Sequence, residues 1–223
     1  MNALLLTNEG TRNVVAGKLP CLEDLLWEWV TIQERSIRIW KGEDALWWYG
    51  ERTALGAFAG SIWRSGGFVL EEYSTQKLSP EGRARSKKES CAGRGDMDFE
   101  LGGQHFSIEA KSCWARMSVE GRFLQSVQDA LEAAKRDADR SQLPPGYSRL
   151  AVVFCAPSCV PRYGDSIQDL ISACVRAARN VKGCACAWAF PELGRKLRDE
   201  EEDRLYPGAT VFVKWVGGRR PRA

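Results

Sequence analysis

One short segment carries two acids and a lysine whose spacing could support phosphate chemistry. It reads GRGDMDFELGGQHFSIEAK from residue 93 to residue 111, and the three residues are Asp96, Glu109 and Lys111. Glu109 and Lys111 are two positions apart, so in a β-strand their side chains project to the same face. Carboxylates are the hard oxygen ligands that Mg²⁺ prefers, and an ammonium beside them can orient an attacking water. The segment therefore predicts a site for a cation and a phosphate.

The Gly102-Gly103 pair lies between two alternating stretches and predicts a two-residue hairpin turn. Leu101 would then face Gln104, and counting outward places Asp96 directly across from Glu109. Directly opposed residues of a hairpin have Cβ atoms about 4.5–5.5 Å apart. Two carboxylates at that distance repel each other unless a cation or a shared proton compensates. The register is thus a second reason to expect a bound cation.

Two alternatives to this site stay open. Asp98 shares the face of Asp96 but lies opposite Ser107, nearer the turn, so the register favours Asp96. A slip of one residue in the turn would weaken that preference. The whole hairpin could also be a surface feature with a solvated cluster of acids and lysine, because an E-x-K tripeptide often arises by chance.

A third acid, Glu51, falls on the apolar face of a helix that we expect to begin at Asp44 and to end at Gly66-Gly67. That face is formed by Trp47, Trp48, Leu55, Phe58 and Ile62. A carboxylate within an apolar stripe is costly unless it is paired or bound to a metal. The alternative is that Glu51 lies at the edge of the stripe and reaches water.

The most basic stretch of the chain, residues 77 to 94, comes just before the hairpin. Its cations are Lys77, Arg83, Arg85, Lys87, Lys88 and Arg94. A charge run of this kind is either a solvated loop or a loop that contacts phosphates. The charge run alone is more typical of a solvated loop, but its position beside the predicted site strengthens the interpretation as a phosphate-contacting loop.

Hydrophobic periodicity predicts an α/β fold with a mixed central sheet and helices on both sides. Residues 1–20 show no clear pattern and are expected to be irregular. Helices are expected over residues 21–34, 44–65, 119–140, 165–178 and 192–205. Strands are expected over residues 36–40 (or an extended link there), 68–74, 93–111 as the hairpin, 150–156, 184–190 and 210–216. A strand, a long helix and another buried strand indicate a parallel crossover.

The order of these features resembles the PD-(D/E)xK nucleases, which share the restriction-endonuclease-like fold. GRGD before an apolar strand, then IEAK, resembles the name-giving pattern, with Gly95 where the family's loosely kept proline would stand. The Glu51 helix followed by SGGFVLEEYSTQK resembles the first core helix and strand, and VVFCAP takes the place of the later parallel strand. The resemblance covers about residues 44 to 156.

The resemblance implies a role for each matching residue. Asp96 and Glu109 would be metal ligands, and Ala110 would offer its backbone carbonyl to the metal. Lys111 would be the catalytic lysine, helping a water to attack phosphorus in line. Glu51 would correspond to the helix acid that in some members completes a second metal site. The implied cofactor is Mg²⁺ or Mn²⁺.

Composition sets the frame for these hypotheses. The 223 residues, with 44% hydrophobic and 27% charged residues, fit one large folded domain. We expect an N-terminal arm and helix over residues 1–43, a nuclease-like core over 44–216 and a basic flexible tail over 217–223. The net charge of +3 permits an anionic partner without requiring one. The eight cysteines form no C-x-x-C pair and are expected to be reduced. The opening MNALLLT lacks the features of a signal peptide, so a cytoplasmic location without a membrane span is expected.

We therefore expect a Mg²⁺-dependent endonuclease that acts on DNA in defence, restriction or DNA processing. The alternative is a catalytically silent module of the same fold that binds nucleic acid or a protein within a larger assembly. RNA as substrate, a homodimer and a contribution of Glu71 or Glu72 to the site stay open. Trp114 could stack on a base, or it could belong to the core or its rim.

Overall fold

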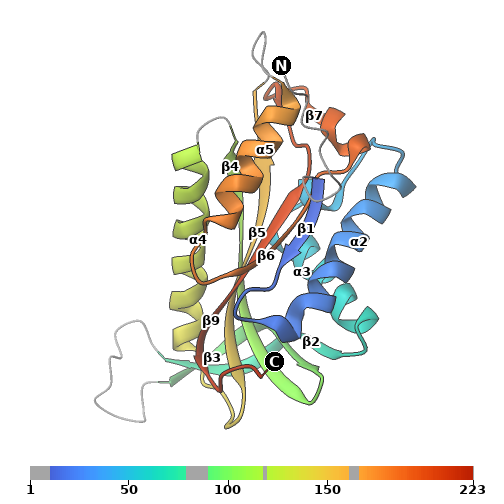
Figure 1. The fold of residues 1–223 in the computed structure, drawn as a ribbon. Coiled ribbons are helices and arrows are strands. Elements are labelled where there is room, and N and C mark those ends of the chain that lie inside the picture. Colours follow the sequence, from blue (N-terminus) through green and yellow to red (C-terminus); the bar gives the residue numbers. More distant parts are fainter. Residues whose placement is uncertain (1–10, 79–89, 118–119, 161–165, 223) are drawn as a thin grey trace.

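The computed structural model describes residues 11–78, 90–117, 120–160 and 166–222 (Figure 1). The helices are α2 (Glu23–Ile39), α3 (Glu51–Arg64), α4 (Glu120–Arg140) and α5 (Ile167–Arg179), with short 3₁₀ helices η1 (Pro20–Leu22), η2 (Leu46–Trp48) and η3 (Glu192–Lys196). The strands are β1 (Arg12–Val15), β2 (Phe68–Leu78), β3 (Ser90–Leu101), β4 (Gln104–Arg116), β5 (Ser148–Ser158), β6 (Ala185–Ala189), β7 (Arg198–Asp199), β8 (Arg204–Leu205) and β9 (Ala209–Gly218).

Seven strands form one mixed sheet in the order β1-β6-β9-β5-β4-β3-β2. Strands β4 and β5 are parallel, and α4 connects them as the predicted crossover. The other pairs of this sheet are antiparallel. In Figure 1, α4 and α5 lie on one side of the sheet, and α2 and α3 lie on the other. The predicted α/β fold with a mixed, two-sided sheet is confirmed.

Each face of the sheet has its own apolar core. Along β5, Val152 and Phe154 belong to the core under α2 and α3, whereas Val153 and Cys155 belong to the core under α4 and α5. This alternation buries β5 on both faces, as its unbroken apolar run predicts. The central position of β5 also supports β4, the strand that carries Glu109 and Lys111.

The sequence of α4 explains why this helix lies against β4 and β5. Its buried side chains Phe123, Val127, Leu131 and Ala134 recur at helical spacing, as predicted. Full burial of a Leu, Val or Phe side chain contributes roughly 1.5–3 kcal/mol each. This packing fixes the last turns of α4 beside the sheet, where they contact the predicted site.

Two predicted boundaries near the N-terminus are wrong. Residues 36–40 were expected to form a strand or link, but α2 continues to Ile39, and Ser36 and Ile37 are buried on its inner face. The helix expected from Asp44 begins only at Glu51. The Asp44 carboxylate instead accepts hydrogen bonds from the Ala45 N–H and the Tyr49 hydroxyl, both at 2.7 Å. These bonds link the two ends of η2, and α3 begins after it with Glu51 as its first residue.

Other differences concern the two ends of the chain. Part of the N-terminal arm is regular, because β1 pairs with β6. Residues 192–205 are not a helix but form η3 and the small β7–β8 hairpin. After β9, in the segment expected to be flexible, the Arg222 N–H donates to Gln104 Oε1 at 2.7 Å. The C-terminal segment therefore contacts the tip of the β3–β4 hairpin.

The described cysteines are all free, four of them buried and three partly buried. This agrees with the prediction of reduced thiols for every cysteine except Cys91, whose side chain lies outside the described residues. No helix in the described part of the chain is long and apolar enough to cross a membrane.

Candidate active site

The β3–β4 hairpin has the predicted turn and register. Gly102 and Gly103 adopt φ angles of +58° and +71°, which other residues rarely tolerate at both positions. The pairing runs outward from Leu101 opposite Gln104 to Met97 opposite Ile108. The register inferred from the two glycines is therefore confirmed.

Pairing between β3 and β4 stops at Met97 and Ile108 in the described strands, although β4 continues to Arg116. Beyond this point β3 stays with β2 and separates from β4. Asp96 therefore lies one position past the last pair, rather than in a ladder with Glu109 as expected. Past Ile108 the edge of β4 that faces β3 therefore has no strand partner among the described residues; we call this unpaired edge the gap, and the candidate site lies along it.

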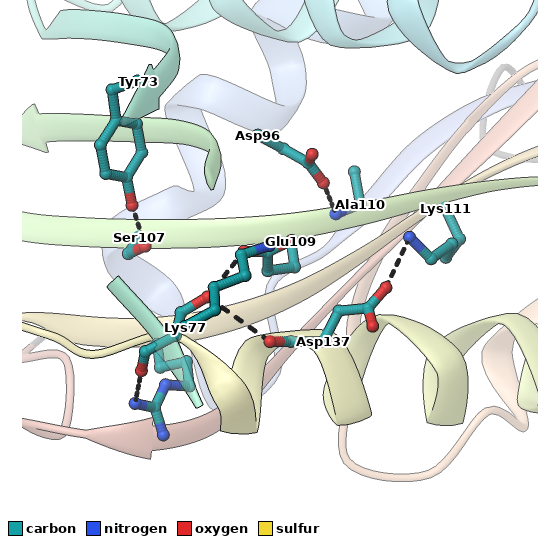
Figure 2. Close-up of polar contacts among 10 residues, drawn as sticks. Tyr73, Lys77, Asp96, Ser107, Glu109, Ala110, Lys111 and Asp137 are labelled. Carbon is teal, nitrogen blue, oxygen red and sulfur yellow. Dashed lines mark hydrogen bonds and ion pairs between the residues drawn. The ribbon is translucent and has the colours of Figure 1, made fainter. Parts of the chain in front are cut away.

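Two carboxylates accept hydrogen bonds from backbone N–H groups of β4 that no longer pair with β3. In the alternation of an antiparallel ladder, the N–H groups of Ala110 and Ser112 point toward β3. Asp96 Oδ2 accepts from Ala110 N at 2.8 Å, and Glu51 Oε2 accepts from Ser112 N at 3.0 Å. Figure 2 shows the first of these contacts. Acids from β3 and from the start of α3 thus converge on neighbouring positions of β4.

The position of Ala110 suits its expected role. The N–H and C=O groups of one strand residue point to the same edge of the strand. Because the Ala110 N–H contacts Asp96, the Ala110 carbonyl also faces the gap. Its methyl group is fully buried on the α2 and α3 side, which holds the backbone in place.

Glu109 points toward α4 and is almost fully buried, with 3% of its surface exposed. Its Oε1 contacts Lys77 Nζ at 2.8 Å and accepts a hydrogen bond from the Ser141 hydroxyl at 2.7 Å (Figure 2). Burial raises the pKa of Glu109, the contacts with Lys77 and Ser141 oppose this rise, and the charge of Asp96 adds to it. Glu109 is therefore a buried carboxylate that already has a cation beside it.

Lys111 forms an ion pair with Asp137 of α4, with a distance of 2.8 Å between Nζ and Oδ2 (Figure 2). Burial acts to lower the pKa of Lys111, but the contact with Asp137 and the charges of Glu51 and Asp96 outweigh it, so the pKa is raised. Lys111 consequently stays protonated at neutral pH. It can donate hydrogen bonds and stabilise negative charge, but it cannot act as a general base there.

The pKa of Glu51 depends on the charges of the other site residues. Burial raises its pKa, Lys111 lowers it, and the negative charges of Asp96 and Asp137 raise it further. Glu51 lies in the first turn of α3 and accepts a hydrogen bond from Ser112 N, so it is not an unpaired carboxylate within the apolar stripe. It is instead a hydrogen-bonded acid that faces the gap.

Asp98, the rival of Asp96, lies in a different environment. It is opposite Ser107 in the hairpin, and burial raises its pKa, whereas the hydroxyls of Ser107 and Tyr73 lower it. Its Oδ1 is buried and has no hydrogen-bond partner among the described residues. Asp96, by contrast, affects the pKa values of Glu51, Glu109 and Lys111, so the contacts favour Asp96 as the site acid.

Gly95 leaves room for the Tyr73 side chain beside β3. A Cβ atom at this position would lie 2.5 Å from Cζ of Tyr73, its partner on β2. The glycine therefore lets the Tyr73 ring cross β3, and the Tyr73 hydroxyl contacts Ser107 Oγ at 3.0 Å (Figure 2). This contact ties the edge strand β2 to β4 beside Glu109.

The basic stretch is described only at its two ends. Lys77 contacts Glu109, and Arg94 forms an ion pair with Glu72. The expected phosphate contacts of Arg83, Arg85, Lys87 and Lys88 lie outside the described residues. The two described cations therefore bind acids of the protein in this structure, which the sequence did not predict.

Glu71 and Glu72, whose contribution to the site the sequence analysis left undecided, do not contact the site residues directly. Glu72 lies opposite Asp96 between two paired positions of β2, has a φ angle of +49°, and binds Arg52 and Arg94. Glu71 is exposed. Asp137 and Ser141, in contrast, are contacts that sequence reasoning missed. The only feature of the sequence that could have indicated them is their position next to the predicted buried face of α4.

The described residues contain no group of three or more His, Cys, Asp or Glu side chains arranged to hold a metal ion. The donor chemistry nevertheless suits a hard cation, because Asp96 and Glu51 each use one oxygen for a backbone N–H and a carboxylate has further lone pairs. At Glu109 the ammonium of Lys77 occupies the place of a cation. Comparisons with protein-family models, curated proteins and solved structures find no match.

Proposed function

We propose that this protein is a Mg²⁺- or Mn²⁺-dependent endonuclease of the PD-(D/E)xK type that hydrolyses phosphodiester bonds in DNA. The observation that carries the proposal is the gap beside β4. There, Asp96 and Glu51 are bound to the N–H groups of Ala110 and Ser112, and Lys111 lies between these two positions in the sequence. Acids from two other elements thus meet the E-x-K strand.

The element order supports a restriction-endonuclease-like core. Helix α3 is followed by the antiparallel strands β2, β3 and β4, then by α4 and the parallel strand β5. This is the arrangement that the sequence resemblance implies. The proposed acids lie where the strands of this unit separate.

In the proposed reaction the protein residues orient and stabilise charges. Asp96, Glu51 and the Ala110 carbonyl would hold the metal ion, with Glu109 joining them once Lys77 has moved away. The metal would supply Lewis acidity, which activates water and neutralises phosphate charge. Asp137 holds the protonated Lys111 so that its ammonium can donate to the phosphate oxygens as negative charge develops. Water forms the new bond to phosphorus as the bond to the leaving sugar oxygen breaks; the attacking water gives up a proton to the solvent, and the leaving oxygen takes a proton from the solvent.

A cleavage assay tests the proposal. Supercoiled and linear DNA are incubated with the protein in Mg²⁺ or Mn²⁺, beside Lys111→Ala, Asp96→Asn and the matched control Asp98→Asn, with folding checked by circular dichroism. Cutting by wild type and by Asp98→Asn, but not by the other two, is expected. Equal cutting by all four proteins, or loss of cutting only in Asp98→Asn, would reject the assigned site.

The second candidate is a catalytically silent module of the same fold. The contacts of Glu109 with Lys77 and Ser141 favour it, because they satisfy this acid without a metal. This candidate predicts no cutting of DNA or RNA and no heat of Mn²⁺ binding by calorimetry. Cutting that is lost in Lys111→Ala excludes it.

A further inference from the structure

An aromatic hollow adjoins the proposed site on the α2 and α3 side of the sheet. Tyr49 and Trp114 line it, and each has 49% of its surface exposed. Tyr49 comes two residues before Glu51, and Trp114 comes two residues after Ser112, whose N–H binds Glu51. The hollow and the proposed phosphate site are therefore next to each other.

Three residues that line the hollow carry a buried polar atom without a hydrogen-bond partner among the described residues. Trp29 Nε1, Gln33 Oε1 and Ser112 Oγ are buried and make no hydrogen bond within the described part of the chain. Trp29 and Gln33 are each only 2% exposed. Unsatisfied buried groups cost about 1–3 kcal/mol each, so a ligand or a bridging water that pairs with them is favoured. The set includes donors and acceptors, which suits a ligand edge that carries both.

The size and charge of the hollow restrict its ligand. The interior of the hollow has room for about one water, and its empty volume of about 370 Å³ includes the solvent at its mouth. No charged side chain is among the described residues that line it. A flat, neutral ring would therefore lie at the mouth against the aromatic side chains and direct one polar group inward.

We propose that this hollow binds an unpaired nucleobase beside the cleaved phosphate, so that the substrate is single-stranded DNA or a single-stranded branch. An unpaired base has a free π-face for Trp114 or Tyr49 and a free edge for the polar atoms. A base within a duplex has both its faces stacked and its edge paired. The inference rests on the proposed nuclease function, because that function supplies the neighbouring phosphate.

Binding without chemistry tests the inference. The full chain is titrated in EDTA against a fluorescein-labelled single-stranded oligonucleotide, the same sequence as a duplex, and a single-stranded RNA of that sequence, with anisotropy as the readout. Tighter binding of the single strands than of the duplex is expected. Trp114→Ala and Tyr49→Ala should each weaken single-strand binding roughly five- to 100-fold, the effect of losing one base–aromatic stack. Trp114→Phe should retain most of the affinity.

Trp63→Ala is the matched control, because Trp63 is 51% exposed but packs against Phe68 rather than lining the hollow. It should bind like wild type. Duplex binding as tight as single-strand binding, or an equal loss in Trp63→Ala and Trp114→Ala, would overturn the inference. Cutting confined to duplex DNA would reject the binding of an unpaired base in the hollow and would leave the proposed nuclease function standing. Single-strand binding that depends on Trp114, with no cutting at all, would reject the proposed nuclease function and would support base binding in the hollow.

Discussion

Lys77 and Glu109 form an ion pair between the end of β2 and the middle of β4, with 2.8 Å between Nζ and Oε1 and side chains only 16% and 4% exposed. The pair closes the side of the gap that faces α4. Ser141, the residue directly after α4, donates a hydrogen bond to the same carboxylate oxygen. Three elements are therefore held together at one atom.

Replacement of Lys77 by Met should destabilise the fold. It leaves the Glu109 carboxylate buried without its cation, which typically costs about 3–5 kcal/mol. Urea denaturation measures the change in the free energy of unfolding. The matched control is Lys135→Met, which removes an exposed pair with Asp139 and should cost no more than about 0.5 kcal/mol. Equal midpoints for the two variants would contradict a structural role of the Lys77 pair.

The same Lys77→Met variant should bind Mn²⁺ more tightly than wild type when nucleic acid is absent. If Glu109 has the metal-binding role proposed above, the Lys77 ammonium competes with a divalent cation for it in wild type, and the variant removes this competitor. Calorimetry below the denaturation midpoint measures the dissociation constant, which should fall several-fold. An unchanged or weaker affinity would show that Glu109 is not a metal ligand, whereas Asp96→Asn should weaken binding in either background.

Asp137→Asn should shift the pH dependence of the proposed DNA cleavage. The Asp137 carboxylate contributes to the raised pKa of Lys111, so its neutralisation lowers that pKa. Lys111 would then lose its proton at a lower pH, and the alkaline limb of the rate profile should move to lower pH. Lys111→Ala should lower the rate roughly 100-fold or more across the profile. A rate reduction in Asp137→Asn without any change in profile shape would indicate a merely structural role.

Glu51→Gln should make the protein more stable than wild type above about pH 4.5, the ordinary pKa of this group. Burial raises the pKa of Glu51 in the folded state, so the folded protein binds more protons than the unfolded chain as pH rises through this range. The wild-type contribution is full at acid pH and is lost as pH rises through the folded pKa. Thermal melts from pH 4 to pH 8 should show a widening difference, and a constant difference would contradict the argument.

Gly95→Ala should destabilise the fold by about 1–3 kcal/mol, because the new methyl group meets the Tyr73 ring. Gly121→Ala in α4 is the control, since nothing lies within 4 Å of its Cβ position and alanine favours a helix. It should be neutral or slightly stabilising. Denaturation curves compare the two, and destabilisation by both variants alike would argue against the specific contact.

The sequence predicted the hairpin well because a two-residue glycine turn sets the pairing register, with Leu101 opposite Gln104. That register favoured Asp96 over Asp98, which shares its face, and the spacing of two positions placed Glu109 and Lys111 on one face. The helix α4 and the strand β5 were predictable because their apolar patterns are long and regular. Where the pattern was short, as over residues 36–40 and 192–205, alternation and helical spacing could not be distinguished.

The partners of the site residues could not be predicted. Lys77, Asp137 and Ser141 reach Glu109 and Lys111 through tertiary packing, and no local spacing encodes these contacts. The separation of β3 from β4 was also unpredicted, because a hairpin register alone implies that pairing continues. The N–H groups freed by this separation are what direct Asp96 and Glu51 to the gap.

The open edge of β4 also matters for the behaviour of the protein in solution. An unpaired row of backbone groups is a template for strand addition by another chain. Asp96 and Glu51 cover the N–H groups of Ala110 and Ser112 and put negative charges there, which opposes such aggregation. Alanine at either acid would uncover the edge, whereas Asn or Gln retains an acceptor. Amide replacements are therefore the ones that separate a loss of chemistry from a loss of solubility.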